Sequence, residues 1–395
     1  MSELLEGVRV LDLSRVLAGP YCGMCLADMG AEVIKIEAPG KGDDSRANAP
    51  IVNGVSAYFM NLNRNKKGIT LNLKSPEGKK IFEELVAQSD IVIENYRPGV
   101  LERLGLGYEE LKKINPAIVY GAISGFGHYG PYSKRAGYDI IGQAMSGLMS
   151  TTGWPDSPPT RTGTAISDVV GGMSCCIGIL AAYINRLKTG VGEKVDVSLV
   201  DSMVSSLEII NMIYLCTGRV PTPIGNRYEA IYPYDSFQAS DGYVIIACGN
   251  DKLYNTFKEV VPLPGLEEER FSTNLQRVQN HAPLKEIIEA WTRERTIDET
   301  VELLLEAGIP ASPINTIDRV VKDPHIAGAR EMFVDCEHPV AGKLKLTGSQ
   351  FKFADHKCTV RMPAPLLGQH NEEILTGLLG RTAEEVAQYA AEGVL

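Results

Sequence analysis

The alternation of short apolar runs with segments of helical period, in the first 127 residues, constrains the fold more than any other feature of this sequence. Apolar runs predict strands at residues 8–14, 31–39, 68–74, 90–96 and 117–127. Segments 23–30, 75–89 and 108–116 predict helices, and Ser75 followed by Pro76 is a strong helix start. Strands that alternate with helices indicate an α/β fold: a Rossmann-like parallel sheet, covered on both faces and joined by right-handed crossovers.

The length of 395 residues exceeds one typical core, so two domains are expected. We expect residues 1–220 to form a large Rossmann-like domain that ends in a strand and one long helix at 192–218. Residues 221–325 change to turns and strands followed by two helices, which is typical of a smaller α+β domain. Residues 326–395 are expected to return to the first domain as a loop and a helix.

The charge and hydropathy patterns limit the classes of partner. A net charge of −10 argues against non-specific nucleic-acid binding, which depends on neutralising phosphates. The N-terminal residues include acids and no long apolar region, so they do not resemble a signal peptide. The longest nearly apolar run, 169–184, is shorter than a bilayer span and is interpreted as a buried helix. We therefore expect a cytoplasmic protein without a membrane role.

Two of the eight cysteines, Cys22 and Cys25, form a CxxC motif after the first predicted strand. This spacing occurs in thioredoxin-like redox sites, and it also occurs where two thiols face a core from one side of a helix. No second CxxC or histidine pair supplies the remaining ligands of a zinc site, so no metal is expected. We expect replacement of both cysteines to affect mainly packing.

In an open parallel sheet, ligands bind beyond the carboxyl ends of the strands. The GxGxxG fingerprint is absent after the first strand, which disfavours a nicotinamide cofactor. Several cations lie at or near predicted strand ends, where they would bind a polyanionic ligand or form an ordinary solvated face. These cations are Arg64, Lys66, Lys67, Lys74, Arg97 and Arg103.

Two further groups of polar residues follow predicted strands. Asn95 and Tyr96 come directly after a buried strand, where they offer a hydrogen bond and a stacking face or form an ordinary turn. Tyr138 and Asp139 precede an apolar segment, which they either line as part of a pocket or cap. The spacing does not decide between these interpretations.

Asp168 is the single acid at the start of the apolar run. Capping of the helix by Ser167 or Asp168 is the commonest reason for an acid at such a place. Alternatively, the helix N-terminus would favour the anionic form, and a poorly hydrated carboxylate is a competent nucleophile. On that interpretation, Gly171 and Gly172 would let a ligand's reactive atom approach the backbone closely.

Several blocks of sequence, taken together, resemble the class III CoA-transferases, the family of the formyl-CoA:oxalate and carnitine CoA-transferases. The blocks cover nearly the whole chain: GVRVLDLSRVLAGPYCGMCLADMGAEVIKIEAPGKGD, NRNKKGITLNLKSPEGKK, DIVIENYRPGVLERLGLGYEEL, SGFGHYGPYSKRAGYDIIGQAMSG, SDVVGGM and PAPLLGQHNEEIL. The resemblance implies transfer of CoA from an acyl-CoA to a free carboxylic acid through an aspartyl-CoA thioester on Asp168. It also implies a homodimer of two interlocked ring-shaped subunits.

The resemblance makes CoA a substrate and implies no permanently bound cofactor, no metal and no nicotinamide. It places the CoA contacts on residues that match the family's binding blocks. These are Leu17, Ala18, Leu71, Asn72, Leu73, Lys74, Asn95, Tyr96, Arg97, Arg103 and Tyr138, with Arg135 bordering the pantetheine.

The sequence departs from the family pattern at two places. Some members carry a basic residue near Ala38, and oxalate-type members carry a glycine-rich loop where residues 222–235 have no glycine run. Two alternative functions remain open. The α-methylacyl-CoA racemases use a histidine and an aspartate as paired acid and base, and here Tyr138 stands where that histidine would be. A non-catalytic CoA-binding protein with the same fold is the other alternative.

Overall fold

The computed structural model describes residues 3–395, which divide into two compact units. The larger unit comprises residues up to Met149, Arg161–Arg219 and Pro324–Leu395, and the smaller comprises Ser150–Thr160 and Val220–Asp323. The predicted boundary at residue 220 puts residues 150–160 in the first domain, but this segment joins the smaller unit, where the backbone N–H of Gly225 donates to the carbonyl of Gly153 at 2.9 Å.

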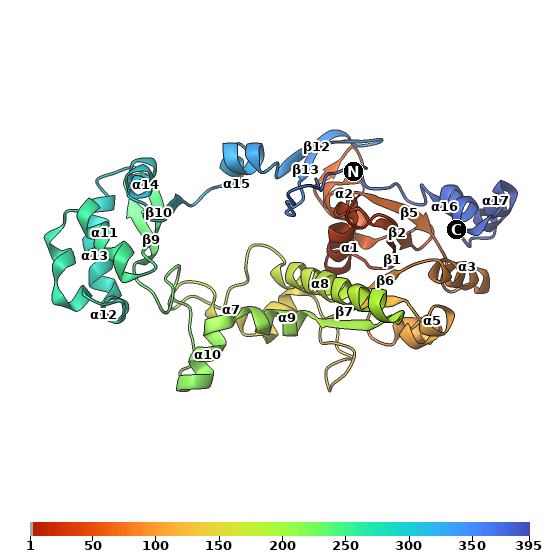
Figure 1. Cartoon of the computed structure of the whole chain (residues 1–395), viewed down its shortest axis with the longest axis horizontal. Coiled ribbons are helices and arrows are strands. Elements are labelled where there is room, and N and C mark those ends of the chain that lie inside the picture. The colour runs from red at the N-terminus through yellow and green to blue at the C-terminus, as the bar shows by residue number, and fades with distance from the viewer. Residues whose placement is uncertain (1–2) are drawn as a thin grey trace. The chain divides into compact units, whose positions relative to one another are not determined.

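The larger unit is built on a six-stranded parallel sheet in the order β5-β2-β1-β6-β7-β8 (Figure 1). Every strand predicted from the first 127 residues is present. The third begins two residues earlier than predicted, and it ends earlier because the Asn72 N–H bonds to the Val394 carbonyl instead of to β2. The strands are β1 (Arg9–Asp12), β2 (Glu32–Glu37), β5 (Lys66–Thr70), β6 (Ile91–Glu94), β7 (Val119–Ser124) and β8 (Lys194–Ser198).

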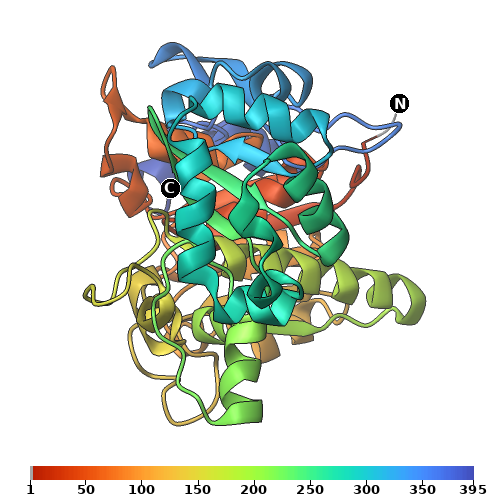
Figure 2. The ribbon, with the colours of Figure 1, turned by 90° about the vertical axis from the view of Figure 1, so that its left-hand side faces the viewer.

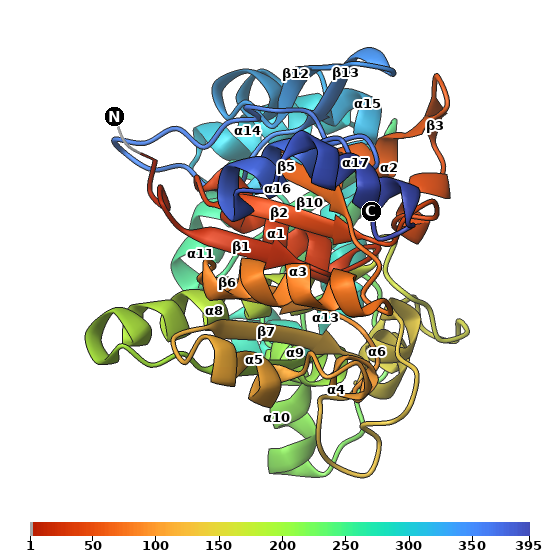
Figure 3. The ribbon, with the colours of Figure 1, turned by 90° about the vertical axis from the view of Figure 1, so that its right-hand side faces the viewer.

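Helices cover both faces of this sheet, which confirms the predicted Rossmann-like arrangement (Figure 3). One face packs against α1 (Ala18–Asp28) and α8 (Ile166–Thr189). The other packs against α3 (Pro76–Ala87), α5 (Tyr108–Ile114), α16 (Asn371–Leu379) and α17 (Ala383–Ala391). The Ser75 side chain accepts from the Gly78 N–H and Pro76 opens α3, as the sequence predicts.

The glycines of α8 serve helix packing. A Cβ at Gly172 would lie 2.5 Å from the Ala18 carbonyl oxygen in α1, and a Cβ at Gly171 would lie 2.7 Å from the Leu199 side chain. The expectation that these glycines admit a ligand is therefore wrong: both are buried, and their missing side chains let α8 approach its neighbours.

Helix α8 is long and apolar enough to cross a bilayer, and α9 (Leu199–Ser206) with α10 (Glu208–Thr217) would qualify as one bent span. In the structure α8 buries Cys175, Cys176 and Ile179 against α1 and the sheet, which is the packing of a core helix. Cys22 and Cys25 face Cys175 and Cys176 there, and burial raises the pKa of the Cys22 thiol well above its usual range. Such protonated, inaccessible thiols support the packing interpretation of the CxxC motif.

The long helix predicted after β8 is in fact two helices, α9 (Leu199–Ser206) and α10 (Glu208–Thr217), which meet at 74°. Glu208 has a positive φ of 22°, which an uninterrupted helix does not allow. Short helices of the larger unit are α2 (Ala57–Asn63), α4 (Val100–Arg103) and α6 (Asp139–Met145). The short α7 (Leu148–Thr151) begins in the larger unit and ends in the smaller one. Two hairpins complete it: β3 (Ile51–Val52) with β4 (Val55–Ser56), and β12 (Phe333–His338) with β13 (Gly342–Thr347).

The smaller unit has its own apolar core between an antiparallel sheet, in the order β11-β10-β9, and four helices (Figure 2). Its sheet consists of β9 (Tyr234–Ala239), β10 (Gly242–Ala247) and β11 (Ala311–Pro313). Its helices are α11 (Asp251–Val260), α12 (Asn274–Gln279), α13 (His281–Thr292) and α14 (Ile297–Glu306), with the short α15 (Ile317–Val320) after β11.

Candidate active site

The candidate site lies where the chain reverses its direction of travel across the sheet. From β1 the chain proceeds to β2 and β5 on one side, then returns to β6, β7 and β8 on the other. The loops that follow β1 and β6 therefore diverge at the switch point, where open α/β sheets form their binding crevice. Asn95 joins these loops, because its side chain accepts from the Arg15 N–H and donates to the Arg15 carbonyl, both at 2.7 Å.

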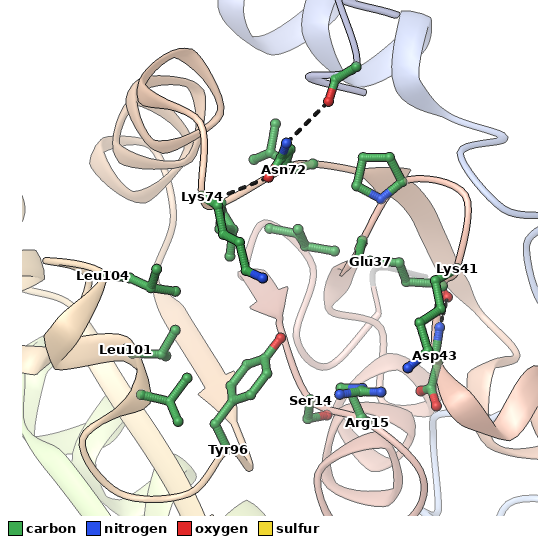
Figure 4. Close-up of a pocket in the computed structure, with 18 residues that line it drawn as sticks. Ser14, Arg15, Glu37, Lys41, Asp43, Asn72, Lys74, Tyr96, Leu101 and Leu104 are labelled. Atoms are coloured by element: carbon green, nitrogen blue, oxygen red, sulfur yellow. Dashed lines mark hydrogen bonds between the residues drawn. The ribbon is translucent and has the colours of Figure 1, made fainter.

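A cavity of about 520 Å³, the Lys74 cavity, opens at the carboxyl ends of β1, β2, β5 and β6 (Figure 4). Apolar walls come from Ile36, Leu71, Leu73, Leu101 and Leu104. Lys74 and Tyr96 point toward one another from opposite sides. The wall around Asn72 is fixed, because its amide donates to the Gly393 carbonyl at 3.3 Å and accepts from the Lys74 N–H at 3.1 Å.

Cations at this cavity suit an anionic ligand. The exposed Lys74 ammonium makes no ion pair with any residue of the range 3–395. Arg15 and Lys41 also line the cavity, and both pair with the exposed Asp44. Exposed ion pairs are weak, so a phosphate competes readily with Asp44 for these two side chains.

A second cavity of about 310 Å³, the Asp168 cavity, shares Arg15, Tyr96 and Val100 with the first, so the two adjoin. Its lining combines the β1, β6 and β7 loops with the start of α8. The residues that line it include Leu17, Ala18, Asn95, Arg97, Arg135, Tyr138 and Asp168.

Asp168 lies in the first turn of α8 and is half-buried. The N-cap residue is Ala165, so the expectation that Ser167 or Asp168 caps the helix is wrong. Ser167 is instead buried against Asp139, whose Oδ1 accepts from its N–H and hydroxyl, both at 2.9 Å. The Asp168 carboxylate makes no hydrogen bond or ion pair within the described chain, which leaves it available to a reactant.

The surroundings of Asp168 disfavour its charge. Burial, followed by repulsion from Asp139, raises the pKa of Asp168 to about 7. These effects outweigh the stabilisation of an anion that the sequence suggested for the helix N-terminus. Tyr58 in α2 is close enough to sense the same charge, because burial and then Asp168 raise its pKa to about 12. A poorly solvated carboxylate is more nucleophilic than a hydrated one.

We expect Asp168→Asn to stabilise the fold at high pH. The folded-state pKa of about 7 exceeds the ordinary 3.8, so the carboxyl group destabilises the native state progressively from pH 4 to pH 7 and constantly above. The gain at pH 8 should be on the order of 1 kcal/mol, since a half-buried carboxyl is partly solvated. Denaturant unfolding at pH 4 and pH 8 measures it, and an equal gain at both values would contradict the electrostatic cause.

The structure brings together nearly all the residues that the sequence singled out. Leu71, Asn72, Leu73 and Lys74 line the Lys74 cavity, and Tyr96 lines both cavities. Leu17, Ala18, Asn95, Arg97, Tyr138 and Asp168 line the Asp168 cavity. Arg103 is exposed on α4 and is not among the residues that line either cavity.

Three cations of the predicted basic cluster do not face a ligand. Arg64 is buried and forms a two-pronged pair with Asp28, with nitrogen–oxygen distances of 2.7 and 3.2 Å. Lys66 is fully buried on Asp12 at 2.8 Å, and Lys67 pairs with Glu32 and Glu373. Arg64 and Lys66 therefore neither contact a ligand nor form a solvated face, because buried charges require partners within the protein. Lys67 is partly exposed, and its two ion pairs place it away from both cavities.

Sequence reasoning missed Arg15, Lys41 and Tyr58. Arg15 follows a predicted strand directly, which is the one signal that would have identified it. Lys41 lies in the loop after β2, and its approach to the cavity depends on the turn at residues 39–42. Within residues 3–395, no group of three or more His, Cys, Asp or Glu side chains is placed to hold a metal ion.

Comparison with known proteins gives one consistent result. The chain is 40% identical over 393 residues to the succinyl-CoA:glutarate CoA-transferase of Mus musculus, covering 99% of this chain and 90% of the mouse protein. It is 38% identical to the succinyl-CoA–D-citramalate CoA-transferase of Chloroflexus aurantiacus, covering 99% and 98%. The crystal structure of a CaiB/BaiF family protein from Brucella suis superposes with a TM-score of 0.83 at 39% identity, covering 96% and 100%.

The match to a family model covers most of the chain as well. Residues 5–371 match the model of CoA-transferase family III, a span that includes both cavities apart from Gly393. Relatives at about 40% identity over the full chain are CoA-transferases, so the activity class follows with the fold. This chain therefore belongs to CoA-transferase family III and is an acyl-CoA:carboxylate CoA-transferase.

Proposed function

We propose that this enzyme transfers CoA through a covalent thioester on the Asp168 carboxyl group. The observation that carries the proposal is the Asp168 carboxylate itself: it is half-buried, without a protein partner in the described chain, and it lines a cavity that adjoins a larger, cation-bearing one. A carboxylate that only stabilised the fold would have an internal partner.

The two adjoining cavities match the two ends of an acyl-CoA. The Lys74 cavity combines apolar walls for an adenine ring with Lys74, Arg15 and Lys41 for the phosphates. The pantetheine arm would then pass Tyr96 and Val100, which both cavities share, and bring the thioester to Asp168. The exposed Arg103 would reach only the outer phosphates.

The reaction follows from attack by the Asp168 carboxylate oxygen on the acyl carbon. The carbon–sulfur bond breaks, giving a mixed anhydride and CoA thiolate. The thiolate attacks the aspartyl carbonyl carbon, forms the aspartyl-CoA thioester and releases the donor acid as its carboxylate. The acceptor carboxylate attacks the aspartyl carbonyl carbon of this thioester, the carbon–sulfur bond breaks, and a second mixed anhydride and CoA thiolate form. The thiolate then attacks the acceptor's acyl carbon, which gives the new acyl-CoA and releases Asp168 as its carboxylate. Each step conserves charge, so no net proton transfer is required.

We propose dicarboxylic acids as the substrate class, with succinyl-CoA as donor. The support comes from the two relatives named above, whose names specify succinyl-CoA with glutarate or D-citramalate. In this chain, Arg15, Arg97 and Arg135 line the Asp168 cavity, so a second carboxylate would find a guanidinium there. A screen of acetyl-, succinyl- and butyryl-CoA against mono- and dicarboxylic acids tests the assignment, and a preference for monocarboxylates would overturn it.

Chemical trapping tests the covalent step. The enzyme is incubated with acyl-CoA without acceptor, and intact mass spectrometry should show one CoA adduct per chain. Hydroxylamine should convert the adduct to a hydroxamate, and borohydride should reduce it to an alcohol, which peptide mapping locates. We expect both modifications at Asp168, and modification of another residue would reject the assignment of the nucleophile.

The alternative activities have less support. A racemase needs two groups that exchange a proton with the substrate α-carbon, and no histidine of the described chain lines either cavity. Incubation of one enantiomer of a 2-methylacyl-CoA without acceptor acid separates the activities, because only a racemase would epimerise it. A non-catalytic CoA-binding protein would bind CoA without forming the adduct.

We also propose that the enzyme is a homodimer, which the family resemblance implies as an interlocked pair. Support within this chain comes from α8, whose outer face exposes Met173, Ile177, Ile184 and Leu187 at helical spacing. An apolar stripe of this kind on a core helix is typical of a surface that a second subunit covers.

A charge on that stripe should weaken the dimer. We expect Ile177→Asp to shift the protein toward monomer at micromolar concentration, because a carboxylate would be buried there without a partner. Light scattering coupled to size exclusion measures the mass. Asn185→Asp, exposed on the same helix but about 100° round from Ile184 and so outside the stripe, is the control. A wild-type mass near 43 kDa would contradict the dimer itself.

A further inference from the structure

A buried polar cluster lies beneath the two substrate-lining loops and takes no part in the chemistry described above. It is spread along β6, β7 and β8: Glu94 is the last residue of β6, Tyr120 and Lys194 pair near the amino ends of β7 and β8, and Asp196 lies in the middle of β8. His128, from the loop after β7, completes it. Glu94 is only 2% exposed, so its carboxyl group requires partners inside the protein.

Three donors face the two oxygens of Glu94. One is the Tyr120 hydroxyl on β7, which donates to Oε1 at 3.4 Å, and the other two are N–H groups. The backbone N–H of Tyr96 donates to Oε2 at 2.7 Å. His128 Nε2 lies 3.5 Å from Oε1, and this buried nitrogen has no hydrogen-bond partner. An unsatisfied buried nitrogen next to a carboxylate oxygen is unusual in a folded protein and requires an explanation.

The partners of His128 determine which ring nitrogen carries the proton. The Lys194 ammonium can only donate, and it lies 3.0 Å from Nδ1, so Nδ1 accepts. Burial, followed by the charge of Lys194, lowers the pKa of His128, so the ring is neutral and its one proton is on Nε2. The ring is held in place because the His128 backbone N–H donates to the Asp196 carboxylate at 2.9 Å.

Glu94 therefore stands between two donors on two different loops. Tyr96 belongs to the loop that lines both cavities, and His128 belongs to the loop that leads to Arg135 and Tyr138 in the Asp168 cavity. The opposite side of the first loop is already fastened by the Asn95–Arg15 pair. A hydrogen bond between Glu94 and His128 would connect the other side of the Tyr96 loop to the loop after β7.

We propose that Glu94 is a positioning residue, whose ionised carboxylate joins the Tyr96 loop to the His128 loop when CoA occupies the site. This inference rests on the proposed function, because it assumes that CoA lies across these loops. Only a carboxylate satisfies the geometry, since both neighbours donate and both oxygens must accept. A glutamine accepts through one oxygen alone, and its amide would oppose the other donor.

Because Glu94 must be ionised, the contact that it makes between the Tyr96 loop and the His128 loop should depend on pH. Burial raises the pKa of Glu94 to about 8, so the carboxyl group gains a proton as the pH falls through that value and one acceptor is lost. The charged and titratable groups that face the cluster come from every neighbouring element. They are Tyr120 on β7, Lys194 and Asp196 on β8, Glu102 on α4, Glu110 on α5 and His128 itself.

The test measures CoA binding by calorimetry at pH 7 and pH 9 in an Asp168→Ala parent, which separates positioning from chemistry. We expect the parent to bind CoA about tenfold more tightly at pH 9 than at pH 7, after correction for the titration of CoA. Adding Glu94→Gln should give the weak affinity at both pH values. His128→Leu should give the same weak affinity, and the double variant should be no weaker than either single one.

Glu102→Gln is the matched control, because Glu102 lies 3.9 Å from His128 Nδ1 but is 44% exposed. It should keep a pH-dependent affinity, with the midpoint moved to lower pH because the Glu102 charge contributes to the raised pKa of Glu94. Glu94→Gln with unchanged affinity, or losses that add in the double variant, would overturn the inference. If the parent fails to bind CoA at all, the proposed function itself is wrong.

Discussion

Asp168→Ala should lower the rate of CoA transfer by at least about 10³-fold, because the covalent route has no other nucleophile. CoA binding should stay within a few-fold, since the cations and apolar walls of the Lys74 cavity do not contact Asp168. Initial rates with saturating acyl-CoA and acceptor give the first quantity, and calorimetry with CoA gives the second.

The matched control for that variant is Asp139→Asn, the neighbouring carboxyl group. Asp139 is buried and accepts bonds from Ser167 and Gln143, so its loss should perturb stability and the pKa of Asp168 while leaving a nucleophile in place. We expect measurable transfer in Asp139→Asn and none in Asp168→Ala. Transfer at the wild-type rate in Asp168→Ala would show that the nucleophile is elsewhere.

The pH profile of the wild-type enzyme should follow the same carboxyl group. Asp168 has a pKa of about 7, and only the ionised form attacks, so kcat/KM for acyl-CoA should rise steeply with pH up to about 7. Above that pH it should rise further only through the Glu94-dependent gain in CoA affinity. A profile that is flat from pH 5 to pH 9 would contradict this assignment.

The parts of the fold that local chemistry determines were predictable from sequence. Ser75 and Pro76 mark the start of α3 through a side-chain cap and a fixed φ, both of which act within three residues. The apolar runs identified the strands of the large sheet because the pattern of a buried strand is also local, within a few consecutive residues. The loops after β1 and β6 were placed correctly because parallel strands always end at the same edge.

The parts that depend on long-range contacts were not predictable. Nothing local distinguishes Lys66, which is buried on Asp12, from Lys74, which faces a cavity, since both lie near a strand end. The sequence around Gly172 does not predict that the Ala18 backbone will pack against this glycine. Glu94 and His128 are 34 residues apart, and only the pairing of β6 with β7 brings their segments together.

The second large effect is expected for stability, when Lys66 of the basic cluster is replaced. Lys66→Met should destabilise the fold by about 3 kcal/mol, because it leaves the fully buried Asp12 without its direct partner. Burial alone would raise the pKa of Asp12, yet the charges of Lys66 and then Lys35 outweigh burial and lower it. Lys35 remains in the variant, so the loss should fall at the lower end of the range for broken buried pairs.

Lys67→Met is the neighbouring control, on the same strand but partly exposed. Its two ion pairs, with Glu32 and Glu373, are solvated, so its loss should cost at most about 1 kcal/mol. Urea unfolding compares the free energies of unfolding of the two variants, provided that the dependence of this free energy on urea concentration is the same in both. Calorimetry with CoA on each variant then distinguishes an effect on stability from an effect on binding. If Lys66→Met weakened CoA binding without loss of stability, Lys66 would be a ligand contact after all. The buried contacts of its ammonium with Asp12, the Pro20 carbonyl and Asn63 argue for the structural role, because they already supply three acceptors to its three N–H donors.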